Sequence, residues 1–198
     1  MEKIVNALMV AIEVWDPYTA GHQRRVATLA LAIAEKMDFD KIQLDAIRIA
    51  AILHDIGKIN LPNEILCKPG KLADCEYNLI KVHSKAGYDI LKKIDFPDQV
   101  AEIVYQHHES LNGSGYPRGL RGDKICLGAR ILHIADVVEA ITANRPYRPA
   151  RAIEEALNEI ENDVGEKYDA KVCDICIDLF RNQNFEFKEI KLRNTDRT

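Results

Sequence analysis

The sequence predicts an all-α fold with one long irregular loop. Apolar residues recur every three or four positions along nearly the whole chain, which is the period of an amphipathic helix. No stretch shows the apolar-polar alternation of a β-strand, and no repeat or low-complexity segment is present. The segment 111–126 instead holds four glycines and a proline, which predicts a loop, and loops of this length are usually functional or disordered.

The first three helices are expected over residues 1–15, 17–38 and 41–53. Pro17 ends the first helix and opens the second, because proline fits a first turn but lacks the N–H that a helix interior needs. Asp40 is a suitable N-cap for the third helix. We therefore expect amphipathic helices joined by short turns.

The third helix ends in residues that can bind metal. Its apolar stripe consists of Ile42, Ala46, Ile49, Ala50 and Leu53. The stripe stops at His54 and Asp55, and Gly57 breaks the helix directly afterwards. Side chains at a helix end beside a glycine can converge, because helical geometry no longer holds them apart.

Five further helical segments are expected along the rest of the chain. They run over about residues 74–83, 98–108, 128–142, 150–162 and 170–180. The first two carry His83 and the pair His107 and His108, and the third carries Asp136. The charged tail from residue 182 to 198 has poor periodicity and is expected to fray.

Length and charge limit the class of protein. A chain of 198 residues is long enough for one sizeable core, so a single domain is expected. No apolar run approaches the roughly 18 residues that cross a bilayer, and residues 1–6 lack a signal-peptide pattern, so we expect a cytoplasmic protein without a membrane segment. The net charge of −4 argues against binding long nucleic acids, so an anionic ligand would need a local cationic pocket.

The five cysteines form no even framework and are expected to stay reduced. Cys173 and Cys176 make a C-x-x-C pattern, which can bind zinc or act in redox chemistry. No second such pair is present, and both lie in an apolar helical pattern. We interpret them as buried small apolar residues.

Neighbouring nitrogen and oxygen ligands are the most informative feature of the chain. Imidazole binds first-row transition metals, and a carboxylate can bridge two of them. The candidate ligands use five of the chain's six histidines: His22, His54, Asp55, His83, His107, His108 and Asp136. Any one of these histidines alone could be a satisfied core residue, but the whole set predicts a dinuclear metal site.

The ligand types are compatible with several metals and do not identify one of them. Histidine and carboxylate without thiolate suit Fe, Mn, Zn, Ni or Co. Two cations about 3.5 to 4 Å apart can share a hydroxide nucleophile and offset charge on a phosphoryl group. His133, three residues before Asp136, is interpreted as a packed or supporting residue rather than a ligand.

Four side chains are candidates for substrate contacts. Lys58 follows Asp55 by three residues, so its ammonium can hold a phosphate oxygen at the metals, and these two are the candidate catalytic residues. Arg145 and Arg148 flank a stiff Pro-Tyr turn, and arginine binds phosphate and the guanine edge bidentately. Tyr116 can stack at the rim of the pocket, although its loop could instead be a docking surface. Solvated surface positions are the alternative for the three cations.

The motifs follow a characteristic order along the chain. They are Asp16–His22, His54–Lys58, Lys68–Gly70, His83, His107–Glu109, Gly113–Pro117, Ala129–Ile131, Asp136 and Arg145–Arg148. This series resembles the HD-GYP family of metal-dependent phosphodiesterases, a branch of the HD phosphohydrolases, over about residues 16–180. The resemblance implies an HD-domain helical bundle with a long Gly/Pro-rich GYP loop.

The resemblance also implies how the ligands divide between two divalent metal ions, with iron or manganese favoured. One metal would be bound by His22, His54, Asp55 and Asp136. The other would be bound by Asp55, His83, His107 and His108, so that Asp55 bridges. The family holds its substrate with the segment that contains Arg145 and Arg148.

Four positions depart from the family's pattern. Asn112 stands where the family usually has Asp, which removes a charge, and Cys126 and Ala170 replace common prolines. Tyr18 stands where some members carry a glutamate that helps to bind a third metal. Because a phenol with a pKa of about 10 is a poor ligand beside an ionised carboxylate, we expect two metals rather than three.

The activity implied by the resemblance is hydrolysis of a cyclic dinucleotide, cyclic di-GMP or cyclic GMP-AMP, to the linear dinucleotide. Two alternatives stay open. One is another HD-type nucleotide phosphohydrolase, against which the GYP loop and the Arg-Pro-Tyr-Arg segment argue. The other is a catalytically weak signalling module that binds a cyclic dinucleotide or a partner, against which the complete ligand set and Lys58 argue.

The same resemblance suggests an organisation and a set of partners. Residues 1–15 would be an N-terminal helix that can link to an upstream domain, 16–180 the HD-GYP domain and 181–198 a tail. The implied partners are an upstream sensor or receiver domain, a diguanylate cyclase bound at the GYP loop, and a second copy in a homodimer. The chain could be a fragment of a longer protein.

Overall fold

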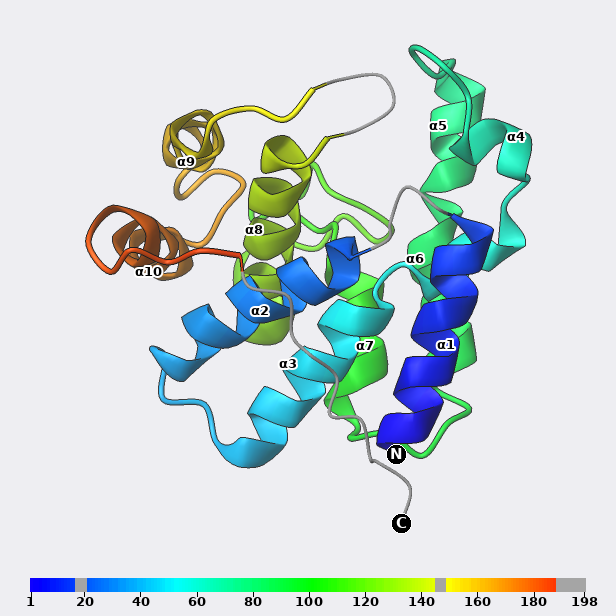
Figure 1. Cartoon of the computed structure of the whole chain (residues 1–198), viewed down its shortest axis with the longest axis horizontal. Helices are drawn as coiled ribbons and strands as arrows, with labels where there is room; N and C mark the ends of the chain where they lie inside the picture. The colour runs from blue at the N-terminus through cyan, green and yellow to red at the C-terminus, as the bar shows by residue number, and fades with distance from the viewer. Residues whose placement is uncertain (17–20, 145–148, 188–198) are drawn as a thin grey trace.

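The computed structural model describes residues 1–16, 21–144 and 149–187, and these residues form a helical bundle (Figure 1). Within these ranges no strand forms, and only two isolated β-bridges occur. The α-helices are α1 (Glu2–Trp15), α2 (His22–Glu35), α3 (Lys41–Leu53), α4 (Asn63–Leu66), α5 (Asp74–Ile80), α6 (Val82–Leu91), α7 (Gln99–Gln106), α8 (Leu127–Thr142), α9 (Ile153–Asn162) and α10 (Ala170–Arg181). The 3₁₀ helices are η2 (Ile56–Asn60) and η3 (Gly122–Lys124). The all-α prediction is confirmed.

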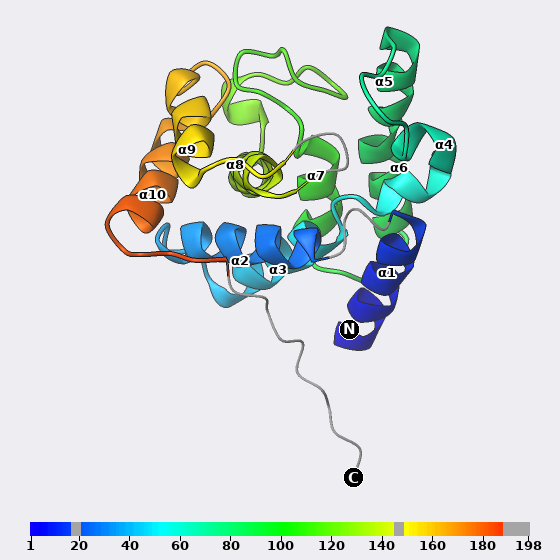
Figure 2. The same ribbon diagram turned by 45° about the horizontal axis from the view of Figure 1, so that its top comes forward.

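The centre of the bundle is made by α2, α3, α7 and α8. Helix α2 packs against both α3 and α8, and α7 packs against α3, α6 and α8. Helices α9 and α10 cover one side of this centre, whereas α1, α5 and α6 lie on the opposite side (Figures 1 and 2). This arrangement brings helix ends from distant parts of the sequence to a common region between α2, α3, α6, α7 and α8.

Aspartates begin two of the helices, and the first of them, Asp40, was predicted as an N-cap. The Asp40 side chain accepts a hydrogen bond from the Gln43 backbone N–H at 2.8 Å, and the Gln43 side chain accepts one from the Asp40 N–H at 2.9 Å. This reciprocal pair satisfies two backbone donors at the start of α3. Asp169 caps α10 by accepting from the Val172 N–H at 3.2 Å.

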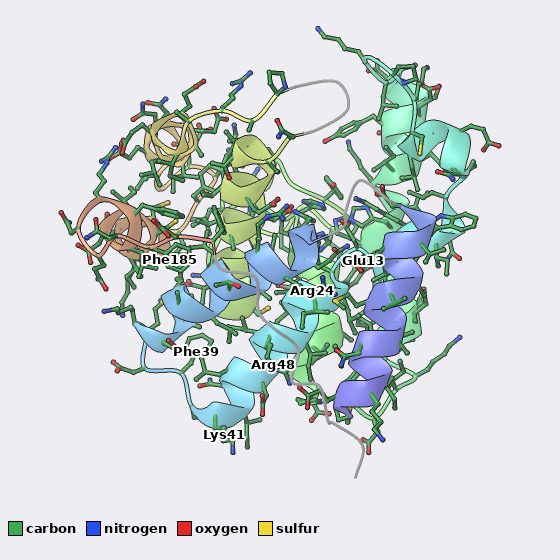
Figure 3. The ribbon with its side chains drawn as sticks, in the orientation of Figure 1. Glu13, Arg24, Phe39, Lys41, Arg48 and Phe185 are labelled. Atoms are coloured by element: carbon green, nitrogen blue, oxygen red, sulfur yellow. The ribbon has the colours of Figure 1, made fainter. Side chains whose placement is uncertain are left out.

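Helix α1 belongs to the same core as the helices that follow. Val5, Met9 and Ile12 are buried on its inner face. Glu13 of α1 also lies 3.5 Å from the guanidinium of Arg24 on α2 (Figure 3). No helix within the described residues is long and apolar enough to span a membrane.

The structure corrects two expectations and confirms a third. Ile42, predicted in the apolar stripe, is 70% exposed, because it is the second residue of α3 and lies in the first turn of that helix. The tail does not fray immediately: the Phe185 ring lies 5.0 Å from that of Phe180, centre to centre, which covers apolar surface. Cys173 and Cys176 are fully buried, as predicted.

Candidate metal centre

The predicted ligands come from five places in the bundle. They lie at the start of α2 (His22), after the end of α3 (His54, Asp55), in the first turn of α6 (His83), after the end of α7 (His107, His108) and within α8 (Asp136). Four of the five places are helix ends, where the chain can change direction. The fold therefore gathers residues that are separated by more than 100 positions.

The ligand atoms form two groups. In one group His22, His54 and Asp136 have ligand atoms within 4.8 Å of one another, and in the other His83, His107 and His108 do.

The Asp55 carboxylate lies between the two groups. Its Oδ2 is 3.4 Å from His54 Nε2, and its Oδ1 is 3.6 Å from His83 Nε2. The structure thus brings all seven predicted residues together, and one carboxylate oxygen faces each group, as a bridging ligand requires.

Backbone carbonyls orient three of the histidines. The Nδ1–H of His54 donates to the Ala51 carbonyl at 2.8 Å, and that of His83 donates to the Ile80 carbonyl at 2.7 Å. His107 makes the same contact, three residues back along the chain, at 2.6 Å. A carbonyl can only accept, so Nδ1 carries the hydrogen and Nε2 of the neutral ring keeps its lone pair.

This tautomer makes the centre suitable for cations. His83 Nε2 and His107 Nε2 lie 3.4 Å apart, and both carry lone pairs that point into the same space. Two such acceptors repel each other unless a proton or a cation lies between them. The chemistry and geometry of the donor set therefore fit bound divalent metal ions.

Burial favours the neutral form of most of these imidazoles. It lowers the pKa of His107 to about 3 and also lowers the pKa values of His83 and His108. His54 behaves differently: burial opposes its charge, but the nearby Asp55 and Asp136 carboxylates together raise its pKa to about 9. A position that holds a proton this strongly is one where a metal cation is also stabilised.

Lys58 lies beside the carboxylate between the two groups. Its ammonium donates to Asp55 Oδ2 at 2.8 Å and lies 3.7 Å from Asp16 Oδ2. Burial would raise the pKa of Asp55, but the charge of Lys58 and the neighbouring His54 together hold it well below its usual range. Asp55 is therefore ionised, and the predicted phosphate-binding ammonium is at the centre.

Sequence reasoning missed a residue that supports His22. Glu139, one turn of α8 after Asp136, is 1% exposed and accepts a hydrogen bond from His22 Nδ1. Its other oxygen accepts from the Arg25 guanidinium at 2.6 and 2.7 Å. The spacing Asp-x-x-Glu on one helical face was the available signal. Glu139 thus fixes the orientation of His22 toward Asp136, as carboxylates commonly do for metal-binding histidines.

Glu139→Gln is expected to weaken metal binding at the His22 group by roughly 10- to 100-fold. The amide keeps the shape of the side chain but removes the charge that holds the His22 ring and Arg25. Metal titration in competition with a chelator measures the change. The matched control is Glu161→Gln, which removes one of the two carboxylate partners of Arg181 on the surface and should leave metal affinity unchanged. Equal affinity in both variants would refute this role.

The loop after α7 folds back onto the histidines. The buried Glu109 carboxylate accepts from the backbone N–H groups of Arg118 at 2.7 Å and Leu120 at 2.8 Å. The Tyr116 ring consequently lies 4.7 Å from the His108 ring, centre to centre. Burial raises the pKa of Tyr116, so its phenol stays neutral at the edge of the centre.

Other predicted positions lie apart from the ligand groups or outside the described residues. The His133 ring packs 5.1 Å from Tyr168, and burial lowers its pKa to about 4. The Asn112 side chain accepts from the Ser114 N–H at 3.0 Å, a contact that requires no charge. The predicted substrate contacts Arg145 and Arg148, and Tyr18 at the third-metal position, lie outside the residues that the structure describes.

Comparison with known families agrees with this arrangement. The model of the HD domain family matches residues 6–172, which is most of the chain. The chain belongs to the HD domain family. This finding confirms the family resemblance that the sequence motifs predicted.

Curated relatives of this HD domain are named as cyclic-dinucleotide phosphodiesterases. The 3'3'-cGAMP-specific phosphodiesterase 3 of Vibrio cholerae is 42% identical over 83% of this chain and 36% of its own length. The cyclic di-GMP phosphodiesterase of Thermotoga maritima is 38% identical over 98% of this chain and 52% of its own length. The HD domain thus spans about half, or less, of these relatives.

Solved structures support the same fold. A cyclic GMP-AMP-specific phosphodiesterase of V. cholerae superposes with a TM-score of 0.72 over 93% of this chain and 49% of its own, at 19% identity. The L. monocytogenes phosphodiesterase PgpH HD domain, in complex with cyclic-di-AMP, gives a TM-score of 0.61 over 89% of this chain and 96% of its own, at 23% identity. At these identities the likeness establishes the HD fold.

Proposed function

We propose that this HD domain hydrolyses a cyclic dinucleotide to the linear 5′-phosphorylated dinucleotide, with two divalent metal ions as cofactors. The observation that carries the proposal is the pair of ligand groups with Asp55 between them. Cyclic di-GMP and cyclic GMP-AMP are the proposed substrates, because the curated relatives are named for them. Iron or manganese are the proposed metals.

The seven candidate ligands would bind two metal ions. His22, His54, Asp136 and Asp55 would hold one metal, and Asp55, His83, His107 and His108 the other. Bound divalent cations supply a hydroxide at neutral pH and offset charge on phosphate oxygens.

Two further groups would act on the substrate itself. Lys58 would hold a non-bridging phosphate oxygen, since its ammonium lies 2.8 Å from Asp55 and is only 17% exposed. Water attacks phosphorus and the ribose 3′ oxygen leaves. The neutral Tyr116 at the edge of the centre offers a surface for a base.

A panel of nucleotides tests the proposal. The metal-loaded protein is incubated with cyclic di-GMP, cyclic GMP-AMP, GTP and nucleoside monophosphates, and the products are separated by chromatography. Conversion of a cyclic dinucleotide to its linear form is expected. Turnover confined to monoesters or triphosphates would favour another HD-type phosphohydrolase, and binding without turnover would favour a signalling module.

The Arg145→Ala, Arg148→Ala double variant is expected to raise the Michaelis constant for the cyclic dinucleotide roughly tenfold or more, because guanidinium contacts to bases or phosphate contribute to binding in ground and transition states alike. Turnover of bis-p-nitrophenyl phosphate, which has no such bases, should change little. Steady-state kinetics with both substrates measures the difference. Equal losses on the two would instead give these arginines a structural or catalytic role.

The remaining inferences about the whole protein stay predictions. They are an upstream sensor or receiver domain, a diguanylate cyclase partner, a homodimer, a cytoplasmic location, and the division into residues 1–15, 16–180 and 181–198. The HD domain spans only part of its curated relatives.

A further inference from the structure

Lys81 lies at the junction of α5 and α6, two residues before the candidate ligand His83. Its ammonium is 4.7 Å from the centre of the Tyr77 ring and 5.6 Å from the centre of the Tyr116 ring. The Tyr116 ring in turn lies against the His108 ring at 4.7 Å, centre to centre. A single aromatic ring therefore separates this cation from the candidate metal centre.

Lys81 differs from the other cations around the centre in its partners. Lys58 is bonded to Asp55, and Arg25 is bonded to Glu139, so a carboxylate already balances each of these charges. Within residues 1–16, 21–144 and 149–187, no carboxylate lies within 4.0 Å of the Lys81 ammonium, and its neighbours are aromatic faces. In a protein of net charge −4, an unbalanced cation at this place is suited to an anionic ligand.

We propose that Lys81 binds the phosphate of the cyclic dinucleotide that is not cleaved. This inference rests on the proposed function. A cyclic dinucleotide carries two phosphodiesters on opposite sides of its ring, so when one is at the metals the other lies some distance away and needs a cation of its own. Lys81 lies at the rim of the centre, with the Tyr116 ring between its ammonium and the His108 ring.

The aromatic neighbours keep the ammonium available for this contact. A contact with an aromatic face at a partly exposed site is weaker than a charge-assisted hydrogen bond to phosphate. The two rings therefore hold Lys81 near the centre in the free protein, and a phosphate can draw it away from them. The phosphates are common to all cyclic dinucleotides. This contact would therefore recognise the sugar-phosphate backbone of the substrate and not its bases.

The test is the variant Lys81→Gln, which removes the charge and keeps a polar side chain. Michaelis constants for cyclic di-GMP and 3'3'-cyclic GMP-AMP are measured on metal-loaded protein, with the products separated by chromatography. Both constants are expected to rise by roughly tenfold or more. Turnover of bis-p-nitrophenyl phosphate, which has a single phosphate, should stay within about twofold of the wild type, as should metal content.

Lys85→Gln is the matched control. It removes one charge from the next turn of α6, where the lysine pairs with Asp89 and is 48% exposed, and it should leave all of these quantities unchanged. Unchanged Michaelis constants for both dinucleotides in Lys81→Gln would overturn this inference alone. A lower melting temperature with equal losses on every substrate would also overturn it, since Lys81 would then be structural. If the wild type binds no cyclic dinucleotide, the proposed function fails and this inference fails with it.

Discussion

Asp55→Ala is expected to abolish turnover and to remove most of the bound metal. Each oxygen of this carboxylate faces a different histidine group, so its loss deprives both groups of their shared ligand. Two cations held close together without a bridging anion would also repel each other. Elemental analysis of the purified variant, together with the rate of cyclic-dinucleotide hydrolysis, measures both effects. Full metal content with normal turnover would contradict the dinuclear centre.

Lys58→Ala is the comparison that separates metal binding from catalysis. Its ammonium contacts Asp55 at 2.8 Å, but an ammonium cannot bind a metal. Metal content should therefore be kept, while turnover falls roughly a hundredfold through loss of a positioned phosphate contact. If Lys58→Ala loses as much metal as Asp55→Ala, the lysine acts mainly by holding Asp55 in place.

Gly57→Ala is expected to destabilise the fold by about 3 kcal/mol or more and to lower metal affinity. A Cβ at this position would lie 1.9 Å from the His83 carbonyl oxygen and 2.6 Å from the Gly87 nitrogen. Both are backbone atoms of α6, so neither can rotate away as a side chain can. The helix that carries His83 would have to move away from η2, which follows His54 and Asp55 directly.

Gly87→Ala is the control on the other side of the same contact. Its Cβ would meet the Val104 side chain at 3.1 Å and the Ile56 side chain at 3.4 Å, and these can shift by a few tenths of an ångström. Alanine also favours a helix over glycine. Denaturant unfolding of both variants, with and without metal, should therefore show a much larger loss for Gly57→Ala. Similar stabilities would mean that α6 can move away from residue 57 at a lower cost than the close backbone contact suggests.

For physical reasons the sequence was enough to predict most of the helices and the residues that the structure gathers at the candidate metal centre, although it did not predict α4 or the part of α6 beyond His83. Apolar spacing reports the buried face of a helix directly, and capping residues such as Asp40 mark where a helix begins. Histidine and aspartate at helix ends are costly to bury without a partner. Their accumulation therefore indicated a metal site before their distances were known.

The supporting contacts could not be predicted, because they join residues that are distant in the chain. Glu139 reaches His22 across 117 positions and Arg25 across 114. Its spacing from Asp136 places it on the same face of α8, but no local pattern shows that it reaches His22 and Arg25. The predicted burial of Ile42 was wrong for a related reason. Apolar spacing shows which face of α3 is buried, but it does not show how far the neighbouring helices extend along that face.

The carbonyl contacts of His54, His83 and His107 bear on how freely the metal can be exchanged. Each ring is held by the turn of backbone that precedes it, so these ligands have little rotamer freedom left to lose when a cation binds. The arrangement of their Nε2 atoms would therefore stay the same whichever divalent ion of similar size binds. The identity of a bound ion would then be set by its abundance and by the affinity order of the transition metals. Protein produced in iron-rich and in manganese-rich medium should accordingly show the same ligand geometry around different elements.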